Sequence, residues 1–99
     1  MQSKAERLIG LATKAGKVIT GIELCEKAVK TNKAGLIVLT KETSDNSVKV
    51  FLNSGIDIIY VDTKEALGKC TGKDTRSVAV ITDENFSTAV LKAYNDKEI

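Results

Sequence analysis

Hydrophobic residues follow two alternating patterns along this chain, one typical of buried strands and one typical of helices. Short, continuous apolar runs such as 35–40 have the length of strands that are covered on both faces. Between these runs, apolar positions recur every three to four residues, as in amphipathic helices. The pattern predicts helices at 2–14, 21–31, 45–54, 63–69 and 83–94, and strands at 17–19, 35–40, 57–61 and 77–82.

Capping residues place the starts of these helices. Two helices begin with a hydroxyl or carboxylate residue three positions before a glutamate, the spacing of a capping box. Gly10 lies inside the first helix, where glycine costs about 1 kcal/mol relative to alanine, so we expect it to pack closely against a neighbouring segment. In the third helix, Val48, Phe51 and Leu52 are predicted to face the core. The predicted N-caps are Thr20 with Glu23, Ser44, Asp62 with Glu65, and Asp83 or Thr82.

The order of the elements predicts an α/β domain with helices on both faces of a sheet. After residue 35, each connection between consecutive strands is long enough for the two strands to pair in parallel. The first strand has a different connection, so it could instead pair antiparallel with its neighbour. The chain has no proline, internal repeat or linker. We therefore predict one domain that covers residues 1–99.

Charge is distributed unevenly over the 99 residues. The formal net charge is only +2, but residues 1–33 hold seven basic and three acidic side chains, which gives +4 for this third of the chain. Such an asymmetry favours a local binding site for a polyanion over a surface that coats DNA generally. The alternative is that these lysines are simply solvated surface residues.

Neither a metal site nor an enzymatic site is predicted. Cys25 and Cys70 form no C-x-x-C pair, and the chain has no histidine, so a zinc site is close to excluded. Cys25 lies on the apolar side of its predicted helix, as a buried free thiol would. No apolar run reaches the roughly 20 residues of a membrane span. We expect a soluble, cytoplasmic protein with reduced thiols and no cofactor.

Known nucleotide-binding motifs are absent. The stretch 68–74 resembles a phosphate-binding loop, but it has three residues between its glycines where that motif needs four, and Asp74 where serine or threonine would bind magnesium. No G-x-G-x-x-G is present. A small nucleotide-handling enzyme therefore has no support in the sequence, and we predict a protein that is not an enzyme.

The run L-I-G-L-A-x-K-A-G-K-V-I-T-G-x-E-L-x-x-K-A-V, from Leu8 to Val29, resembles the kink-turn-binding ribosomal protein family. That family includes ribosomal protein L-seven-Ae and small ribosomal-protein-like chains of Gram-positive bacteria. The segments 34–40, 64–69 and 72–81 agree with it as well. The resemblance implies a three-layer α/β/α sandwich with a mixed four-stranded sheet. It also implies binding to structured RNA, such as ribosomal RNA, at a kinked internal loop with sheared G·A pairs. We expect the protein to be a monomer.

The resemblance also implies where the RNA is bound. In the family, a Gly-x-Asn-Glu-x-x-Lys stretch reads guanine edges, and here Gly21 and Lys27 match it, whereas Glu23 and Leu24 stand in place of Asn and Glu. The second contact is the loop before the last strand, here 71–77. Basic residues near these two segments complete the prediction. The candidate RNA-binding residues are Lys14, Lys17, Thr20, Gly21, Glu23, Lys27, Lys30, Lys73 and Arg76.

These residues also have explanations without RNA. Glu23 could only close its capping box or pair with Lys27 along the helix, which contributes about 0.3–0.5 kcal/mol. Arg76 could pair with Asp74. Because Leu24 forms no side-chain hydrogen bond, an alternative function is a protein-interaction module of the same fold, associated with the ribosome or RNA-processing machinery.

Overall fold

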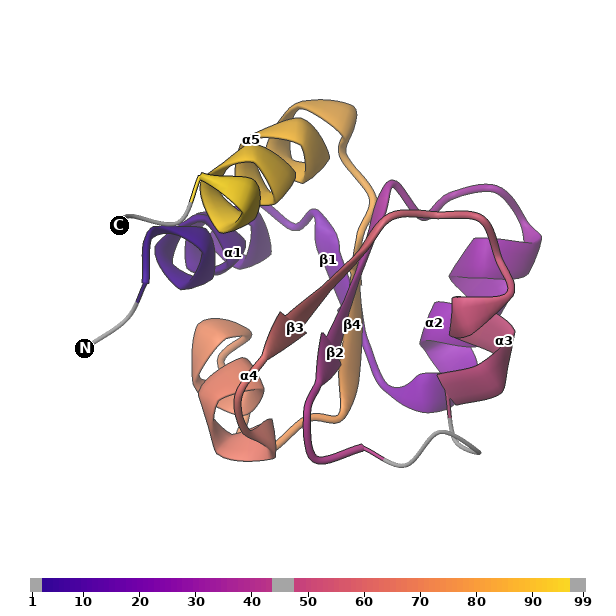
Figure 1. Ribbon diagram of the computed structural model, residues 1–99, viewed down its shortest axis with the longest axis horizontal. Helices are drawn as coiled ribbons and strands as arrows, with labels where there is room; N and C mark the ends of the chain where they lie inside the picture. The colour runs from indigo at the N-terminus through magenta and orange to yellow at the C-terminus, as the bar shows by residue number, and fades with distance from the viewer. Residues whose placement is uncertain (1–2, 44–47, 97–99) are drawn as a thin grey trace.

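Helices and strands alternate along residues 3–43 and 48–96, the part of the chain that the computed structural model describes (Figure 1). The predicted elements are all found within this part, most of them within one or two residues of their expected ends. The helices are α1 (Lys4–Lys14), α2 (Ile22–Lys30), α3 (Lys49–Leu52), α4 (Lys64–Cys70) and α5 (Glu84–Asn95), and the strands are β1 (Val18–Thr20), β2 (Leu36–Thr40), β3 (Ile58–Val61) and β4 (Val78–Ile81).

The third helix differs most from its prediction. α3 ends at Leu52, two residues before its predicted end, and Val48 and Phe51 are buried as expected. Leu52 is exposed, because neighbouring residues of a helix point about 100° apart and Phe51 already faces the core. The predicted cap Ser44 lies outside the described residues.

The sheet is mixed, with the strand order β1-β4-β2-β3. β2 pairs parallel with β3, whereas β4 runs antiparallel to both β1 and β2. The prediction of parallel pairing is therefore confirmed for β3 and wrong for β4. The connection through α4 explains the antiparallel direction of β4. The amide of Arg76, just before β4, donates a hydrogen bond to the carbonyl of Lys64 at the start of α4, at 3.0 Å. That bond returns the chain to the end of the sheet where β3 finished, so β4 must run the other way.

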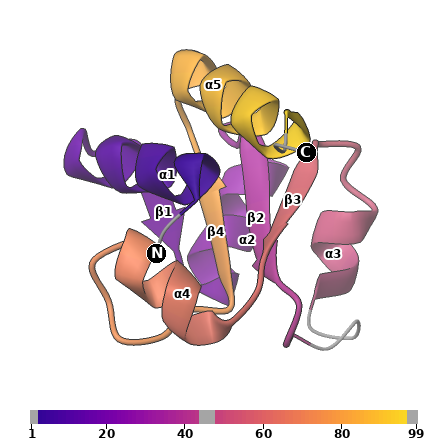
Figure 2. The same cartoon turned by 60° about the vertical axis from the view of Figure 1, so that its left-hand side comes forward.

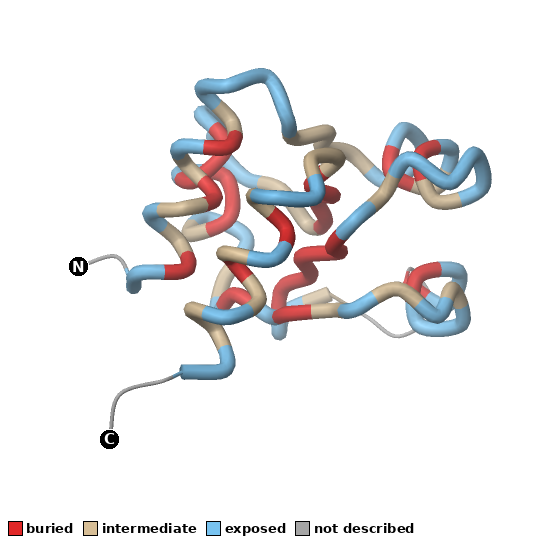
Figure 3. Tube along the Cα trace, turned by 90° about the horizontal axis from the view of Figure 1, so that it is seen from above, coloured by how far each residue is buried: buried red, intermediate tan, exposed pale blue. Residues whose placement is uncertain are grey.

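Helices cover both faces of this sheet, which makes a three-layer α/β/α sandwich as expected. α1, α4 and α5 lie on one face, and α2 and α3 lie on the other (Figures 1 and 2). β2 is buried at all five positions and so forms the centre of the core. In Figure 3 the buried residues follow the central strands and the inner sides of the helices.

β3 lies at the edge of the sheet and is only partly buried, whereas the run 57–61 was predicted to be a buried strand. Ile59 and Val61 are buried, whereas Tyr60 between them is exposed. Side chains of a strand alternate between its two faces, and only one face of β3 is fully covered.

Two predicted caps have different outcomes. Asp83 caps α5, since its Oδ2 accepts a hydrogen bond from the amide of Phe86 at 2.9 Å. The prediction for α4 is wrong by one residue, because Thr63 and not Asp62 is the N-cap and accepts from the amide of Ala66 at 3.0 Å. Both residues have suitable side chains, and the hydrogen bond formed in the fold selects between them.

Gly10 of α1 was predicted to pack closely against a neighbouring segment, and it does face α4. The contact nevertheless leaves room for a methyl group. A Cβ there would lie 3.6 Å from the carbonyl oxygen of Cys70, an ordinary van der Waals distance. We therefore expect Gly10→Ala to raise the free energy of unfolding by about 0.5–1 kcal/mol, because alanine is the better helix former. Urea denaturation measures this, and a lower value would mean that α1 and α4 lie closer than described.

Candidate functional site

A sharp turn at Gly21 connects β1 to α2. Gly21 has φ 97° and ψ 140°, a backbone conformation that is strongly disfavoured for every residue except glycine. Its amide bonds the carbonyl of Val78 on β4 at 3.4 Å. The turn brings the start of α2 to the end of the sheet where β1, β2 and β3 finish and β4 begins, the carboxyl end of the sheet.

The start of α2 has no side-chain cap, so the predicted capping box of Thr20 and Glu23 is wrong. Gly21 occupies the N-cap position, which leaves Thr20 one residue too early to reach the helix amides. Among the described residues, none accepts a hydrogen bond from the backbone amides of Ile22, Glu23 and Leu24. Amides at a helix N-terminus carry partial positive charge and bind acceptors or anions from outside.

Three exposed side chains of different chemistry surround these amides. Glu23 offers a carboxylate, Leu24 an apolar group that is 61% exposed, and Lys27 an ammonium group. Leu24 and Lys27 are three residues apart and so lie on the same flank of α2, and the Cα–Cβ bond of a helical residue such as Lys27 is tilted toward the helix start. Within residues 3–43 and 48–96, no ion pair joins Glu23 to Lys27. Both charges are therefore available to a ligand.

Arg76 connects the loop 71–77 to this helix start. Its Nε donates to Oγ1 of Thr20 at 3.3 Å, and its Nη1 donates to the carbonyl of Thr75 at 2.7 Å. The first bond joins residues 56 positions apart. In the described part of the chain Arg76 forms no ion pair with Asp74. The two segments that sequence analysis selected separately therefore lie side by side at the carboxyl end of the sheet (Figure 1).

The same end of the sheet holds further residues that sequence analysis missed. Oγ1 of Thr43 donates to the carbonyl of Ser77 at 3.4 Å, and Oε1 of Glu42 accepts from the amide of Lys64 at 2.8 Å. These bonds attach the segment after β2 to the loop 71–77 and to α4. No periodicity or motif marks them in the sequence, because each depends on a distant partner.

Three of the nine predicted site residues lie elsewhere. Lys17 stands before β1, and its carbonyl accepts from the amide of Thr82 at 2.9 Å, so it lies at the opposite end of the sheet from Gly21. Lys30 ends α2, roughly 12 Å along the axis from the first residue of that helix. Lys14 ends α1, on the other face of the sheet. The expectation that Lys17 and Lys30 lie around the start of α2 is therefore wrong, and Lys14 lies away from it as well.

Lys73 occupies an intermediate place. It lies in the loop 71–77, but its amide bonds the carbonyl of Gly68 at 2.8 Å, which holds it beside the end of α4. Its side chain is exposed. The residues that the fold brings together are Thr20, Gly21, Glu23, Lys27 and Arg76, with Lys73 further along the same loop.

No catalytic or metal centre accompanies this site in the described ranges. Burial raises the pKa of Cys25 to about 12 and that of Cys70 to about 11, so both thiols stay protonated and unreactive near neutral pH. No group of three or more potential metal ligands occurs among residues 3–43 and 48–96. Within the same ranges, no helix is long and apolar enough to cross a membrane.

Comparison with known proteins gives a consistent set of relatives. The model of the ribosomal protein L7Ae/L30e/S12e/Gadd45 family matches residues 3–92. RNA-binding protein YlxQ of Bacillus subtilis (strain 168) is 31% identical over 88 residues, which cover 85% of this chain and 88% of that protein. RNA-binding protein YlxQ of Enterococcus faecium is 42% identical over 48 residues, which cover 48% of this chain and 47% of that protein.

Solved structures share the fold. A protein of unknown function from Bacillus halodurans C superimposes with a TM-score of 0.88 and 25% identity, over 96% of this chain and all of that one. The 15.5kD RNA binding protein of Giardia lamblia has a TM-score of 0.75 and 17% identity, over 91% of this chain and 83% of its own. At that identity, the second similarity concerns the fold alone.

Proposed function

Because this chain belongs to the ribosomal protein L7Ae/L30e/S12e/Gadd45 family, we propose that it is a non-catalytic RNA-binding protein that recognises a kinked internal loop with sheared G·A pairs. Relatives that are named as RNA-binding proteins support RNA as the ligand. The contact surface is the start of α2 together with the loop 71–77. The hydrogen bond from Arg76 to Thr20 carries the proposal, since it holds both segments in one surface.

The chemistry of this surface suits bent RNA better than a regular duplex. A regular RNA helix has a major groove too narrow for protein side chains, whereas a kink exposes base edges and brings two phosphate backbones together. The open amides of α2 and the ammonium group of Lys27 bind phosphate or base acceptors. The carboxylate of Glu23 accepts a hydrogen bond from a guanine amino or imino group, and Leu24 contacts apolar parts of the nucleotide.

Binding of this kind stabilises the kinked form of the RNA. An RNA loop interconverts between extended and kinked forms, and a protein that binds only the kinked form shifts the population toward it. Extended single strands are a poorer ligand, because they are usually held by exposed aromatic side chains on which bases stack. Of the described aromatic residues, Phe51 is buried, and the exposed Tyr60 lies on the strand farthest from β1.

We expect Lys27→Ala to weaken binding to a kink-turn RNA about tenfold, within the roughly 1–3 kcal/mol typical of such contacts. Loss of one phosphate contact should also lower the slope of log K against log salt by about 0.7–0.9. Fluorescence anisotropy over a range of salt concentrations measures both quantities. The matched control is Lys92→Ala, an exposed lysine in the last turn of α5. Equal binding by the two variants would contradict the site.

A titration of the unmodified protein separates RNA recognition from the alternative function. Leu24 is the observation that favours a protein-interaction module, because an exposed leucine in the first turn of α2 is suited to an apolar protein contact. We expect tighter binding to the kink-turn RNA than to a straight duplex of equal length. Equal, weak and strongly salt-dependent binding to both would favour the protein-interaction module instead.

A further inference from the structure

A groove lies between α1 and the C-terminal end of α4, and its volume is about 460 Å³. Its walls come from the middle of α1, the last turn of α4 and Gly72 in the loop that follows. α1 and α4 pack on the face of the sheet opposite to α2. The groove is thus separated from the start of α2 by the sheet.

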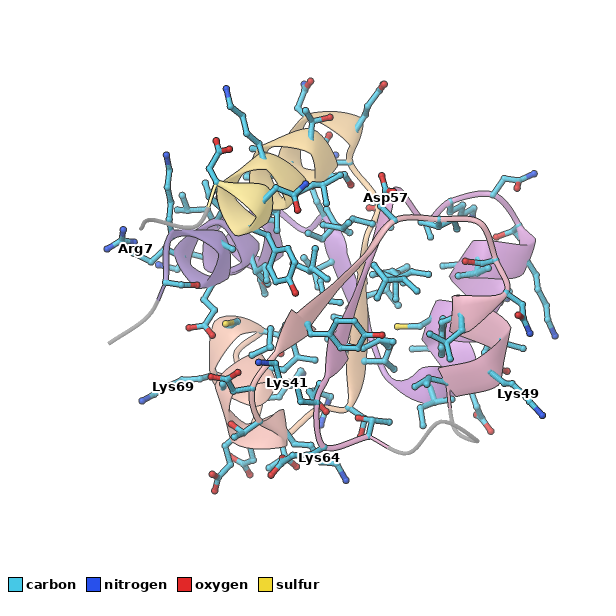
Figure 4. All side chains as sticks on the ribbon, in the orientation of Figure 1. Arg7, Lys41, Lys49, Asp57, Lys64 and Lys69 are labelled. Carbon is cyan, nitrogen blue, oxygen red and sulfur yellow. The ribbon has the colours of Figure 1, made fainter. Side chains whose placement is uncertain are left out.

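Three cationic side chains line this groove. Arg7 and Lys14 are seven residues apart on α1, two helical turns, and therefore lie on the same side of that helix. Lys69 comes from α4, and Figure 4 shows Arg7 and Lys69 extending from the same side of the molecule. No acidic residue lines the groove, and the ion pair found in the described ranges joins Lys41 to Asp62 instead.

The floor between these cations is apolar. Leu11 lines it and is 53% exposed, although full burial of a leucine side chain is favourable by about 1.5–3 kcal/mol. Thr13 offers little to a ligand, because its hydroxyl donates inward to the carbonyls of Ile9 at 2.9 Å and Cys70 at 3.3 Å. The site therefore combines a partly exposed leucine with surrounding positive charge and few free polar groups.

We propose that this groove binds an acidic segment of a protein partner, which places one large apolar side chain on Leu11 and its carboxylates beside Arg7, Lys14 and Lys69. Charge complementarity selects an acidic partner. A peptide satisfies both the leucine and the cations, whereas an RNA backbone would place phosphate against Leu11. Among the described residues, no aromatic side chain lines the groove, so no stacking surface for a base is found there.

The position of the groove allows the partner and another ligand to bind together. Because the sheet lies between the groove and the start of α2, a segment bound on α1 and α4 leaves the start of α2 open, and the groove meets the proposed RNA surface only at Gly72 of the loop 71–77. The protein would then connect an acidic partner to whatever α2 binds. The inference does not depend on RNA binding, and the two can fail independently.

The test begins with selection of random peptides of about twelve residues on the whole protein. We expect enriched peptides to carry aspartate or glutamate around one large apolar residue, with dissociation constants on the order of 10 µM, as for small and transient interfaces. NMR chemical-shift mapping with one labelled enriched peptide should show its largest shifts at Leu11 and its neighbours. Failure to enrich such peptides, or shifts centred elsewhere, would overturn the proposal.

Charge reversal and RNA titration complete the experiment. The double variant Arg7→Glu, Lys69→Glu and the variant Leu11→Asp should each weaken peptide binding at least tenfold, whereas Lys49→Glu, Lys92→Glu should not. All these positions are exposed, and thermal unfolding checks that the variants fold. Kink-turn RNA affinity should be the same in the groove variants as in the unmodified protein. If the RNA instead displaces the peptide and shifts the groove amides, the groove is an RNA site and the proposal is wrong.

Discussion

Gly68→Ala is expected to lower the free energy of unfolding by about 2–3 kcal/mol, although alanine is the better helix former. A Cβ at Gly68 would lie 2.5 Å from the carbonyl oxygen of Asp74, 2.6 Å from its carbonyl carbon and 2.8 Å from the Cα of Thr75. These are backbone atoms, so no rotation of a side chain relieves the overlap. The loop 71–77 would have to move away from α4.

Displacement of this loop should also weaken RNA binding, because Arg76 would move away from Thr20. We expect at least a tenfold loss of affinity for a kink-turn RNA under conditions where the variant is folded. Urea denaturation and anisotropy titration measure the two effects. Gly10→Ala is the matched control, since it is also a glycine-to-alanine change inside a helix but is expected to stabilise. Unchanged stability of Gly68→Ala would mean that the loop is not packed on α4 as described.

Gly21→Ala should have the second large effect, for a different physical reason. Apart from its two chain neighbours, no described residue places an atom within 4 Å of a Cβ at this position, so the cost is backbone strain at φ 97° and not a steric overlap. Strain of this kind costs about 1–3 kcal/mol. Relaxation toward negative φ would turn the first amides of α2 away from their present direction. We therefore expect RNA affinity to fall by more than tenfold, measured at a temperature where the variant is folded.

Gly55→Ala distinguishes local strain from loss of the binding surface. Gly55 also has a positive φ, 81°, and an added Cβ there would meet no atom of the described residues within 4 Å, its chain neighbours aside. It precedes β3, so it lies at the end of the sheet opposite to the start of α2. Its replacement should lower stability to a similar extent and leave RNA affinity unchanged. Equal losses of RNA affinity in both variants would show that the start of α2 is not the contact surface.

Features encoded by local periodicity were predicted well. The runs that form β2 and β4 are buried at every position and apolar at all but Thr40, and the cap of α5 was one of the two residues proposed. The resemblance, carried by the residues around Gly21, is confirmed by the family match, and the three-layer fold that it implied is confirmed as well. The same match agrees with a protein that is not an enzyme.

Choices between neighbouring residues were predicted less well. Thr20 and Gly21 are adjacent, and only the turn geometry shows that Gly21 is the N-cap of α2. α3 ends at Leu52, two residues before its predicted end, and its predicted start lies outside the described residues. For α2, the local sequence permits either residue as the N-cap, and the turn held by the hydrogen bond from the amide of Gly21 to the carbonyl of Val78 selects Gly21.

By itself, the sequence determined the α/β class, the order of the elements, the buried centre at β2 and the family, since each is recorded in the spacing of neighbouring residues. Tertiary structure alone decided that β4 runs antiparallel, that Arg76 bonds Thr20, and that Lys14 joins Arg7 and Lys69 in a separate groove. The physical reason is that periodicity shows whether a side chain faces the core, but not at which end of the sheet it lies. A three-residue strand was enough to carry Lys17 away from the site that its position in the sequence had suggested.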